Sequence, residues 1–283
     1  MTHHRLRAAL HGVRGLVLDA DGVIVLKGAP LPGSVEAVRV LQERRLPFRV
    51  VTNFSQLHRE TFAGWFARSG LVIDPDAIIT ATSATAAYTA AHQAGSALFV
   101  LAADDARREF DGQRLVAADE AERLGPGAVG AVVIGDAGDD LSYRNLDVAF
   151  RLIRGGAEFL AMHRNPWWLT DRGETLDAGG FVAGLEFSTG RPARVLGKPA
   201  PEVFRQAAAA LRSDLGERLP AFSFAMVGDD PRADIAAAQR VGLRGILVLS
   251  GKTSRSDLAT EPRRGRGPDG VADALADVVA ALD

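Results

Sequence analysis

The sequence predicts an α/β fold, a doubly wound parallel sheet of Rossmann-like type with a second α/β domain inserted into it. Short apolar runs alternate with helical patterns through short links, which is typical of a parallel sheet covered by helices. Several of these runs end in polar side chains, as strands do at the ligand-binding edge of an open sheet. The length of 283 residues also fits two domains better than one.

The first third of the chain contains two strand–helix pairs. The apolar run 16–18 predicts a buried strand, and Asp19 and Asp21 follow it directly. Ser34 is placed to cap the first helix through its side-chain oxygen. The elements expected here are a strand at 16–18, a helix from 34 to about 45, a strand at 48–51 and a helix that reaches residue 69 and stops at Gly70.

The rest of the chain continues the alternation, with a polar, glycine-rich loop expected at 170–180 and a loop rich in Arg, Gly and Pro at 250–270. The middle is expected to hold helices at 84–94, at 142–154 and from 181 to 187, and strands at 97–102, 128–134 and 158–162. The last third is expected to hold helices at 199–211, 233–241 and 273–282, and strands at 222–227 and 245–249.

Composition excludes several classes of function. The formal net charge of −2 and the pI of about 6.3 give no basic bias toward nucleic acid or an anionic membrane. The chain has no cysteine, which excludes disulfides, thiolate nucleophiles and cysteine-bound zinc. No apolar run approaches the roughly 20 residues of a membrane span, and residues 1–11 lack the apolar segment of a signal peptide. We therefore expect a cytoplasmic protein with no nucleic-acid or membrane partner.

Polar residues at four places in the chain point to a single site. If the first and last thirds share one parallel sheet, these residues meet at its carboxyl edge. Carboxylates there repel one another, by on the order of 4 kcal/mol for a pair at ~4 Å in an effective dielectric of about 20. A lysine would offset that repulsion, and so would Mg²⁺, which prefers hard oxygen ligands. The residues concerned are Asp19, Asp21, Thr52, Asn53, Lys198, Asp229 and Asp230.

The order of these motifs resembles the haloacid dehalogenase (HAD) superfamily of phosphatases. The motifs are Asp-Ala-Asp-Gly-Val-Ile from Asp19, Thr-Asn at 52–53, Gly-Lys-Pro at 197–199 and Gly-Asp-Asp-Pro-Arg-Ala-Asp at 228–234. The long interval between the second and third motifs is similar to the NagD-like branch, which carries an inserted α/β cap of type IIA. Residues 185–204 and 226–252 are similar to the phospholysine phosphohistidine inorganic pyrophosphate phosphatases. The resemblance implies a core domain at 1–80 and 191–283 and a cap domain at 81–190.

The resemblance also implies roles for the acids. By position, Asp19 is the nucleophile that forms an aspartyl-phosphate, and Asp21 protonates the leaving oxygen and then activates water. Partial burial near the other acids would help to keep Asp21 protonated. Mg²⁺ would be held by the Asp19 carboxylate, the Asp21 backbone carbonyl and Asp229.

Other positions take supporting roles by the same resemblance. Thr52 and Asn53 would bind phosphoryl oxygens, and Lys198 would neutralise the transferring group and the nucleophile. Asp230 would hold a metal-bound water, or is an exposed loop acid. Asp234 would orient Lys198, or is an ordinary acid in the first turn of a helix.

Two features bear on the substrate. The phosphohistidine phosphatases carry Ser where this chain has Asp21, and the acid equips this chain better for poor leaving groups such as alkoxides. In the cap, residues 163–168 follow the strand at 158–162, and this chain reads Ala161-Met162-His163 where many relatives read Ala-Thr-Asn. Arg164 could meet an anionic leaving group. Trp167 and Trp168 either stack on a substrate ring or pack in the cap core or a dimer interface.

The sequence thus predicts a Mg²⁺-dependent phosphatase of a small phosphorylated metabolite, with a cap that closes over the site and room for a homodimer formed through that cap. A phosphotransferase or mutase on the same scaffold and a phospho-accepting signalling domain are left open as alternatives. The segment Gly251-Lys252-Thr253 is like the end of a phosphate-binding P-loop, but residue 246, where the first glycine should stand, is Ile.

Overall fold

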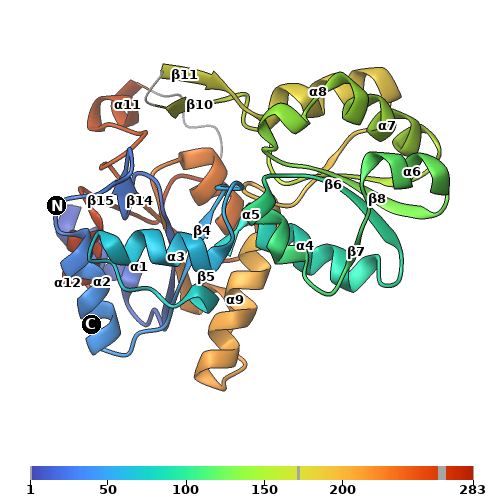
Figure 1. The fold of residues 1–283 in the computed structure, drawn as a ribbon. Coiled ribbons are helices and arrows are strands. Elements are labelled where there is room, and N and C mark those ends of the chain that lie inside the picture. Colours follow the sequence, from blue (N-terminus) through green and yellow to red (C-terminus); the bar gives the residue numbers. More distant parts are fainter. Residues whose placement is uncertain (1, 171–172, 261–265, 283) are drawn as a thin grey trace. The chain divides into compact units, whose positions relative to one another are not determined.

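The computed structural model describes residues 2–170, 173–260 and 266–282. Contacts within it group the chain into two compact units, each with its own sheet (Figure 1). Unit 1 comprises Met1–Thr52, Ala63–Ile79 and Lys198–Asp283, and unit 2 comprises Asn53–Phe62 and Thr80–Gly197. The chain therefore leaves unit 1 and returns to it, which is the arrangement of an inserted domain.

Unit 1 is built on a sheet whose described strands run in the order β15-β14-β13-β1-β4-β5. All residues of β1 and β13 are buried, as expected for central strands that are covered on both faces. The pairs β1–β13, β1–β4, β13–β14 and β14–β15 are all parallel. The strands are β1 (Gly15–Asp19), β4 (Phe48–Thr52), β5 (Ile78–Thr80), β13 (Phe224–Gly228), β14 (Arg244–Val248) and β15 (Gly270–Ala272).

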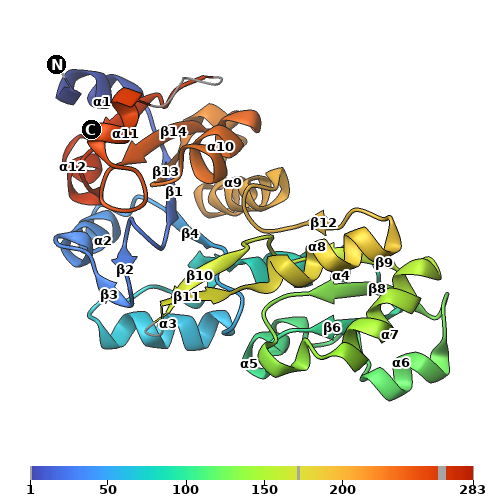
Figure 2. The same ribbon diagram turned by 90° about the horizontal axis from the view of Figure 1, so that it is seen from above.

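Helices cover both faces of this sheet, as Figure 2 shows, so the sheet is doubly wound. α2 packs with α12 on one side, while α9 packs on β1 and β4 and contacts α10 on the other. The helices of unit 1 are α1 (Thr2–Leu10), α2 (Ser34–Glu43), α3 (Arg59–Arg68), which begins in unit 2, η1 (Pro75–Ala77), α9 (Pro201–Leu215), η4 (Ala221–Ser223), the π-helical η5 (Pro231–Ala236), α10 (Ala237–Arg240), α11 (Arg255–Thr260) and α12 (Leu275–Ala280). A short hairpin, β2 (Val25–Leu26) with β3 (Ala29–Pro30), follows β1.

Unit 2 contains a second parallel sheet, in the order β12-β9-β8-β6-β7 among its described residues. Alternate residues of one strand enter different apolar clusters: Val132 packs with Phe159, while Val133 packs with Leu160. The strands are β6 (Ala97–Leu101), β7 (Arg114–Leu115), β8 (Val129–Ile134), β9 (Glu158–Ala161) and β12 (Arg194–Val195). The helices are α4 (Ala81–His92), α5 (Asp104–Arg107), η2 (Arg108–Phe110), α6 (Ala118–Leu124), η3 (Gly138–Asp140), α7 (Tyr143–Arg154) and α8 (Ala178–Thr189).

The predicted α/β class is confirmed: the sheet of unit 1 is a doubly wound, Rossmann-like sheet, and unit 2 adds a second α/β unit. The boundaries differ from those expected at 81 and 190. β12 pairs with β9, so residues 191–197 group with unit 2, and so does the segment 53–62. No helix in the described part of the chain is both long and apolar enough to cross a membrane.

Some local predictions were wrong. Ser34 does not cap α2, because Gly33, with a φ of 78°, occupies the cap position and Ser34 is the buried first helical residue. The loop expected at 170–180 is largely regular: it holds the end of β10 (Trp167–Thr170), all of β11 (Gly173–Leu176) and the start of α8. The loop expected at 250–270 contains α11, and its residues 261–265 lie outside the described part.

The N-terminal helix α1 was not expected. Leu6 and Leu10, four residues apart, are both buried on it. Residues at that spacing lie on the same side of a helix. α1 packs against β15, at the end of the sheet order. Charged residues surround Leu6 and Leu10 in the sequence, so the apolar pattern there is too weak to predict a helix.

Candidate active site

Three buried carboxylates gather at the carboxyl edge of the unit 1 sheet. Asp19 is the last residue of β1, and Asp229 directly follows β13, which is the parallel neighbour of β1. Asp234 lies on η5, which packs against β13. One oxygen of each carboxylate lies within 4.8 Å of the others. The strand ends thus bring together acids from the first and the last third of the chain.

Lys198 is buried among these acids. Its Nζ lies 2.6 Å from Asp19 Oδ1 and 2.8 Å from Asp234 Oδ1. Burial alone would lower the pKa of the ammonium, but the two carboxylates outweigh it and raise the pKa above its usual value. Lys198 is therefore positively charged at neutral pH. Asp19 Oδ1 also accepts the Ala20 N–H at 2.7 Å, so the Asp19 carboxyl is held from two sides.

The acids still exceed the positive charge around them. Burial raises the pKa of Asp19, repulsion from Asp234 raises it further, and Lys198 opposes both. Burial raises the pKa of Asp229 to about 6, against the backbone N–H of Lys252, which stabilises the charged form. Hard carboxylate oxygens in a region of excess negative charge are the donor set that a divalent cation such as Mg²⁺ prefers. The residues present fit such an ion.

Asp21 stands at the turn after β1. Asp21 is exposed at the surface. The chain packed around its carboxyl group nevertheless excludes enough water to raise the pKa of Asp21, and the positive charge of Lys198 opposes this shift. Gly22 has a φ of +76°, and a Cβ there would lie 2.1 Å from Asp229 Oδ2. Only glycine allows the chain to turn this close to Asp229. Gly22 of the first motif thus leaves room for the carboxylate of Asp229 in the fourth motif.

Asp230 has protein partners on both carboxylate oxygens. Its Oδ1 accepts the N–H groups of Arg232 and Ala233 at 2.8 and 2.9 Å, and so caps η5. Its Oδ2 accepts from Lys252 Nζ at 2.6 Å. Although burial favours the neutral acid, these hydrogen bonds lower the pKa of Asp230. These contacts give Asp230 a structural role, because it caps η5 and holds the Lys252 side chain. Neither interpretation of the sequence included this role.

Thr52 and Asn53 fall in different units. Thr52 is the buried last residue of β4, which pairs with β1 beside Asp19. Asn53 groups with unit 2, where its Oδ1 would lie 2.7 Å from a Cβ placed on Gly197. Thr52 thus shares the sheet edge of Asp19. Asn53 lies against the residue that precedes Lys198.

Two of the three cap residues singled out in the sequence, Arg164 and Trp167, are exposed. Arg164 donates to Glu186 Oε2 at 2.6 Å, so its guanidinium is already paired within unit 2. Trp167, in β10, is 52% exposed, and its cross-strand partner Leu176 is 64% exposed. Trp168 is half-buried. Trp167 is therefore not part of the core of unit 2.

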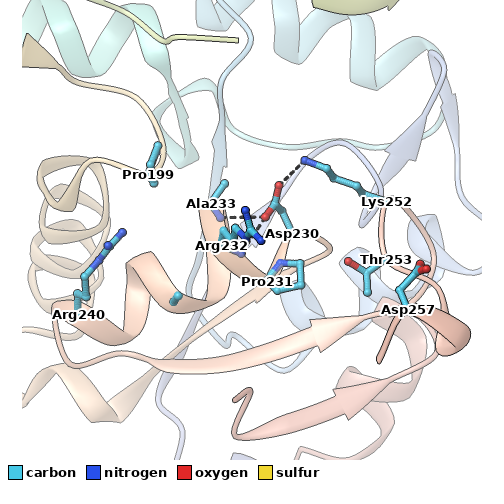
Figure 3. Close-up of a pocket in the computed structure, with 10 residues that line it drawn as sticks. Pro199, Asp230, Pro231, Arg232, Ala233, Arg240, Lys252, Thr253 and Asp257 are labelled. Carbon is cyan, nitrogen blue, oxygen red and sulfur yellow. Dashed lines mark hydrogen bonds and ion pairs between the residues drawn. The ribbon is translucent and has the colours of Figure 1, made fainter. Parts of the chain in front are cut away.

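A cavity of about 660 Å³ in unit 1 adjoins Asp230 (Figure 3). Lys252 and Asp230 are joined on one side of it, and Arg240 lies on the opposite side. Sequence reasoning did not assign Lys252 to the site. The available signal was its rarity, because Lys27, Lys198 and Lys252 are the three lysines of a chain whose basic charge is otherwise arginine.

Unit 2 contains a buried polar cluster that the sequence also did not reveal. Ser55 Oγ lies 3.0 Å from His163 Nε2, and Asp177 Oδ1 lies 3.7 Å from the same nitrogen. The Asn165 N–H donates to His163 Nδ1, so Nε2 carries the proton and donates to Ser55. A histidine in this state cannot remove a proton from the serine. The cluster therefore holds the chain together rather than forming a hydrolytic triad.

Comparison with known proteins agrees with this geometry. Residues 16–115 match a family model described as haloacid dehalogenase-like hydrolase, and residues 195–278 match one described as HAD-hydrolase-like. The chain is 33% identical over 276 residues to human phospholysine phosphohistidine inorganic pyrophosphate phosphatase, covering 95% of this chain and 94% of the relative. The chain therefore belongs to the haloacid dehalogenase family of hydrolases.

Solved structures place it within that family. A p-nitrophenyl phosphatase from Archaeoglobus fulgidus is similar with a TM-score of 0.83 and 29% identity, covering 95% of this chain and 99% of that one. NagD from E. coli K-12 has a TM-score of 0.78 and 25% identity, over 93% and 97%. A glycerol phosphate phosphatase from Mycobacterium tuberculosis, in complex with magnesium, has a TM-score of 0.80 and 27% identity, over 95% and 77%. The predicted NagD-like phosphatase of the HAD type is thereby confirmed as the class of enzyme.

Proposed function

We propose that this enzyme is a Mg²⁺-dependent phosphatase that hydrolyses a small phosphorylated metabolite through an aspartyl-phosphate on Asp19. The observation that carries the proposal is the buried cluster of Asp19, Lys198, Asp229 and Asp234 at one sheet edge. It combines a fixed carboxylate, a charged lysine and an excess of negative charge, which together suit the transfer of a phosphoryl group.

Asp19, Asp229 and the Asp21 backbone carbonyl would hold the ion. Asp234 belongs to the same acidic triad, but its pairing with Lys198 favours a role in orienting the ammonium. When bound, Mg²⁺ would shield the charge of the phosphoryl oxygens from the attacking carboxylate. The magnesium in the related glycerol phosphate phosphatase supports the choice of metal.

The chain's own residues divide the reaction into two displacements. In the first, an Asp19 oxygen bonds to phosphorus while the bond to the leaving oxygen breaks, and Asp21 gives that oxygen its proton. In the second, Asp21 takes a proton from a water molecule that attacks the phosphorus, which releases phosphate and restores Asp19. The raised pKa of Asp21 favours the protonated acid that the first step needs.

The remaining residues would bind the transferring group. Lys198, held between Asp19 and Asp234, would balance the charge that collects on the phosphoryl oxygens. Thr52 and Asn53 would donate hydrogen bonds to those oxygens. In the cap, Arg164 and Trp167 are exposed and would contact the leaving group. An acid at position 21 suits alkoxide leaving groups.

The proposal is tested by steady release of phosphate from a panel of phosphorylated metabolites, with Mg²⁺ and with excess EDTA. The panel includes sugar phosphates, nucleotides, pyridoxal phosphate, pyrophosphate and phosphohistidine. Asp19→Asn removes the nucleophile in nearly the same volume and is expected to abolish turnover while the protein stays folded. Wild-type turnover by that variant would refute the nucleophile. Transfer to an added acceptor in place of phosphate release would favour a phosphotransferase or mutase.

We also propose a cytoplasmic location and a homodimer formed through unit 2. The exposed pair Trp167 and Leu176 offers an apolar contact surface. Light scattering coupled to size-exclusion chromatography, on the wild type and on Trp167→Ser, tests the dimer.

A further inference from the structure

We propose that Lys252 is a positioning residue that sets the charge of the metal site, so that the site takes a single divalent cation. This inference rests on the proposed function, because it concerns the same acids. The inference goes beyond the proposed function because it assigns a role to the segment Ser250–Thr253, the loop after β14.

The segment Ser250–Thr253 contacts both acidic motifs. The Lys252 N–H donates to Asp229 Oδ2 at 2.6 Å, and the Thr253 hydroxyl donates to the Asp229 carbonyl at 2.7 Å. The Ser250 hydroxyl donates to the Gly22 carbonyl at 2.7 Å. Backbone and hydroxyl groups of this loop therefore fix Asp229 and the turn after β1 at once.

Close approach of the chain makes this contact possible. A Cβ on Gly251 would lie 2.1 Å from Asp229 Oδ2 and 2.5 Å from the Gly22 Cα. Any side chain at position 251 would displace the Asp229 carboxylate. The glycine therefore allows the next residue, Lys252, to present its N–H to that carboxylate.

The Lys252 side chain acts on the second acid. Its Nζ lies 2.6 Å from Asp230 Oδ2, while the other oxygen of Asp230 is used by the amides of η5 (Figure 3). Both oxygens of Asp230 thus already accept hydrogen bonds, and the Lys252 ammonium beside the carboxylate would repel a second cation there.

The balance of charge points the same way. Four carboxylates, those of Asp19, Asp229, Asp230 and Asp234, are paired with or adjoin two ammonium groups, those of Lys198 and Lys252. Two negative charges are left over, because Asp21 carries its proton before the proposed first step and adds none, and one divalent cation would neutralise them. Removing the ammonium of Lys252 would leave a third negative charge and free an oxygen of Asp230.

The test is calorimetric titration of the substrate-free enzyme with Mg²⁺. Lys252→Met keeps the backbone N–H on Asp229 and removes only the ammonium from a side chain that is 71% exposed. Attraction of the ion then rises, and we expect Mg²⁺ to bind roughly three- to tenfold more tightly than to the wild type at low salt. Lys252→Gln should behave alike, and Lys252→Arg should stay within about twofold of the wild type. The wild type should bind one ion.

Arg240→Met is the matched control. It removes one positive charge from the opposite side of the same cavity and should leave the Mg²⁺ affinity within about twofold (Figure 3). Unchanged or weaker binding by both Lys252→Met and Lys252→Gln would overturn the inference, and so would two ions on the wild type. If the wild type bound no Mg²⁺ at all, the proposed metal-dependent function would fail as well, so the two failures are distinguishable.

Discussion

Asp21 and Asp19 are two residues apart, but their surroundings suit them to different chemistry. Asp19 is buried and paired with Lys198, so its carboxyl is fixed in place. Asp21 is exposed and has a raised pKa, so it can exchange protons with the leaving group and with water. The same divergence of environment separates a nucleophile from a general acid in other enzymes with paired carboxylates.

Asp21→Asn therefore should affect substrates unequally. Alkyl phosphates need a proton on the leaving oxygen, whereas aryl phosphates release a phenolate without one. We expect kcat/KM to fall by about 10²- to 10⁴-fold on an alkyl phosphate and clearly less on p-nitrophenyl phosphate. Equal losses on the two substrates would contradict the acid role of Asp21.

The pKa of Asp229 predicts how metal binding depends on pH. Its folded-state pKa of about 6 lies above the ordinary aspartate value of 3.8. In the metal-free protein the stability gained from protonating Asp229 is fully present below the unfolded value and is lost as the pH rises through about 6. Protons and Mg²⁺ therefore compete for Asp229.

We expect the rise in Tm produced by Mg²⁺ to be large at pH 8 and to shrink as the pH falls below about 6. Calorimetric scans at fixed Mg²⁺ from pH 5 to 8, each paired with an EDTA sample, measure it. A Tm rise that is independent of pH over this range would exclude Asp229 as a ligand.

At the scale of elements, the buried cluster of Ser55, His163 and Asp177 joins three segments of unit 2. Ser55 follows β4, His163 follows β9, and Asp177 caps α8 through the Ala178 N–H. Burial lowers the pKa of His163 and raises that of Asp177, while the attraction between the two groups opposes both shifts. Because the lowered pKa leaves His163 neutral at pH 7, its contact with Asp177 at 3.7 Å is not an ion pair there, and His163 stabilises the unit mainly as a neutral donor to Ser55.

The free energy of unfolding of unit 2 should therefore fall as the pH is lowered below about 6.5, at pH values where most carboxylates are still ionised. A lowered His163 pKa contributes stability that is present above the unfolded value of about 6.5 and is lost as the pH falls below it. The loss can reach about 1.4 kcal/mol per pH unit. His163→Gln keeps a donor and should show a lower free energy of unfolding at pH 7.5 but a flatter dependence between pH 6.5 and 5. Parallel pH profiles for the two proteins would contradict this account.

At the scale of the whole molecule, the chain has two compact units, and the buried acidic cluster of Asp19, Asp229 and Asp234 found among the described residues lies in unit 1. An ion that binds the native form stabilises it by about 2.7 kcal/mol when present at one hundred times its Kd. That stabilisation belongs to the unit that contains the ligands.

Hydrogen exchange with and without Mg²⁺ should show this division. We expect slower exchange at the ends of β1 and β13 and in Ser250–Thr253, and unchanged exchange in β6 and β8 of unit 2. Protection spread equally over both units would indicate that Mg²⁺ binds elsewhere or that the units unfold together.

Sequence reasoning succeeded where the signal is local. Apolar runs such as 16–18 and 48–51 marked β1 and β4, because central parallel strands are buried on both faces. It failed where tertiary contacts decide the outcome. The polar, glycine-containing stretch after Trp167 forms the β10–β11 hairpin through cross-strand pairs, and Ser34 is buried at the start of α2 beside a glycine cap.

The sequence by itself determined the fold class, the order of the four motifs and the identity of the acids and the lysine that converge. It could do so because the apolar run of a strand and the polar residues at its end are neighbours in the chain. Only the tertiary structure decided that Lys198 lies between Asp19 and Asp234, and that the loop at 250–253 reaches back to Asp229 and Gly22. The physical reason is that these pairs are far apart in the chain, so their distances depend on how parallel strands are ordered in the sheet rather than on any local pattern.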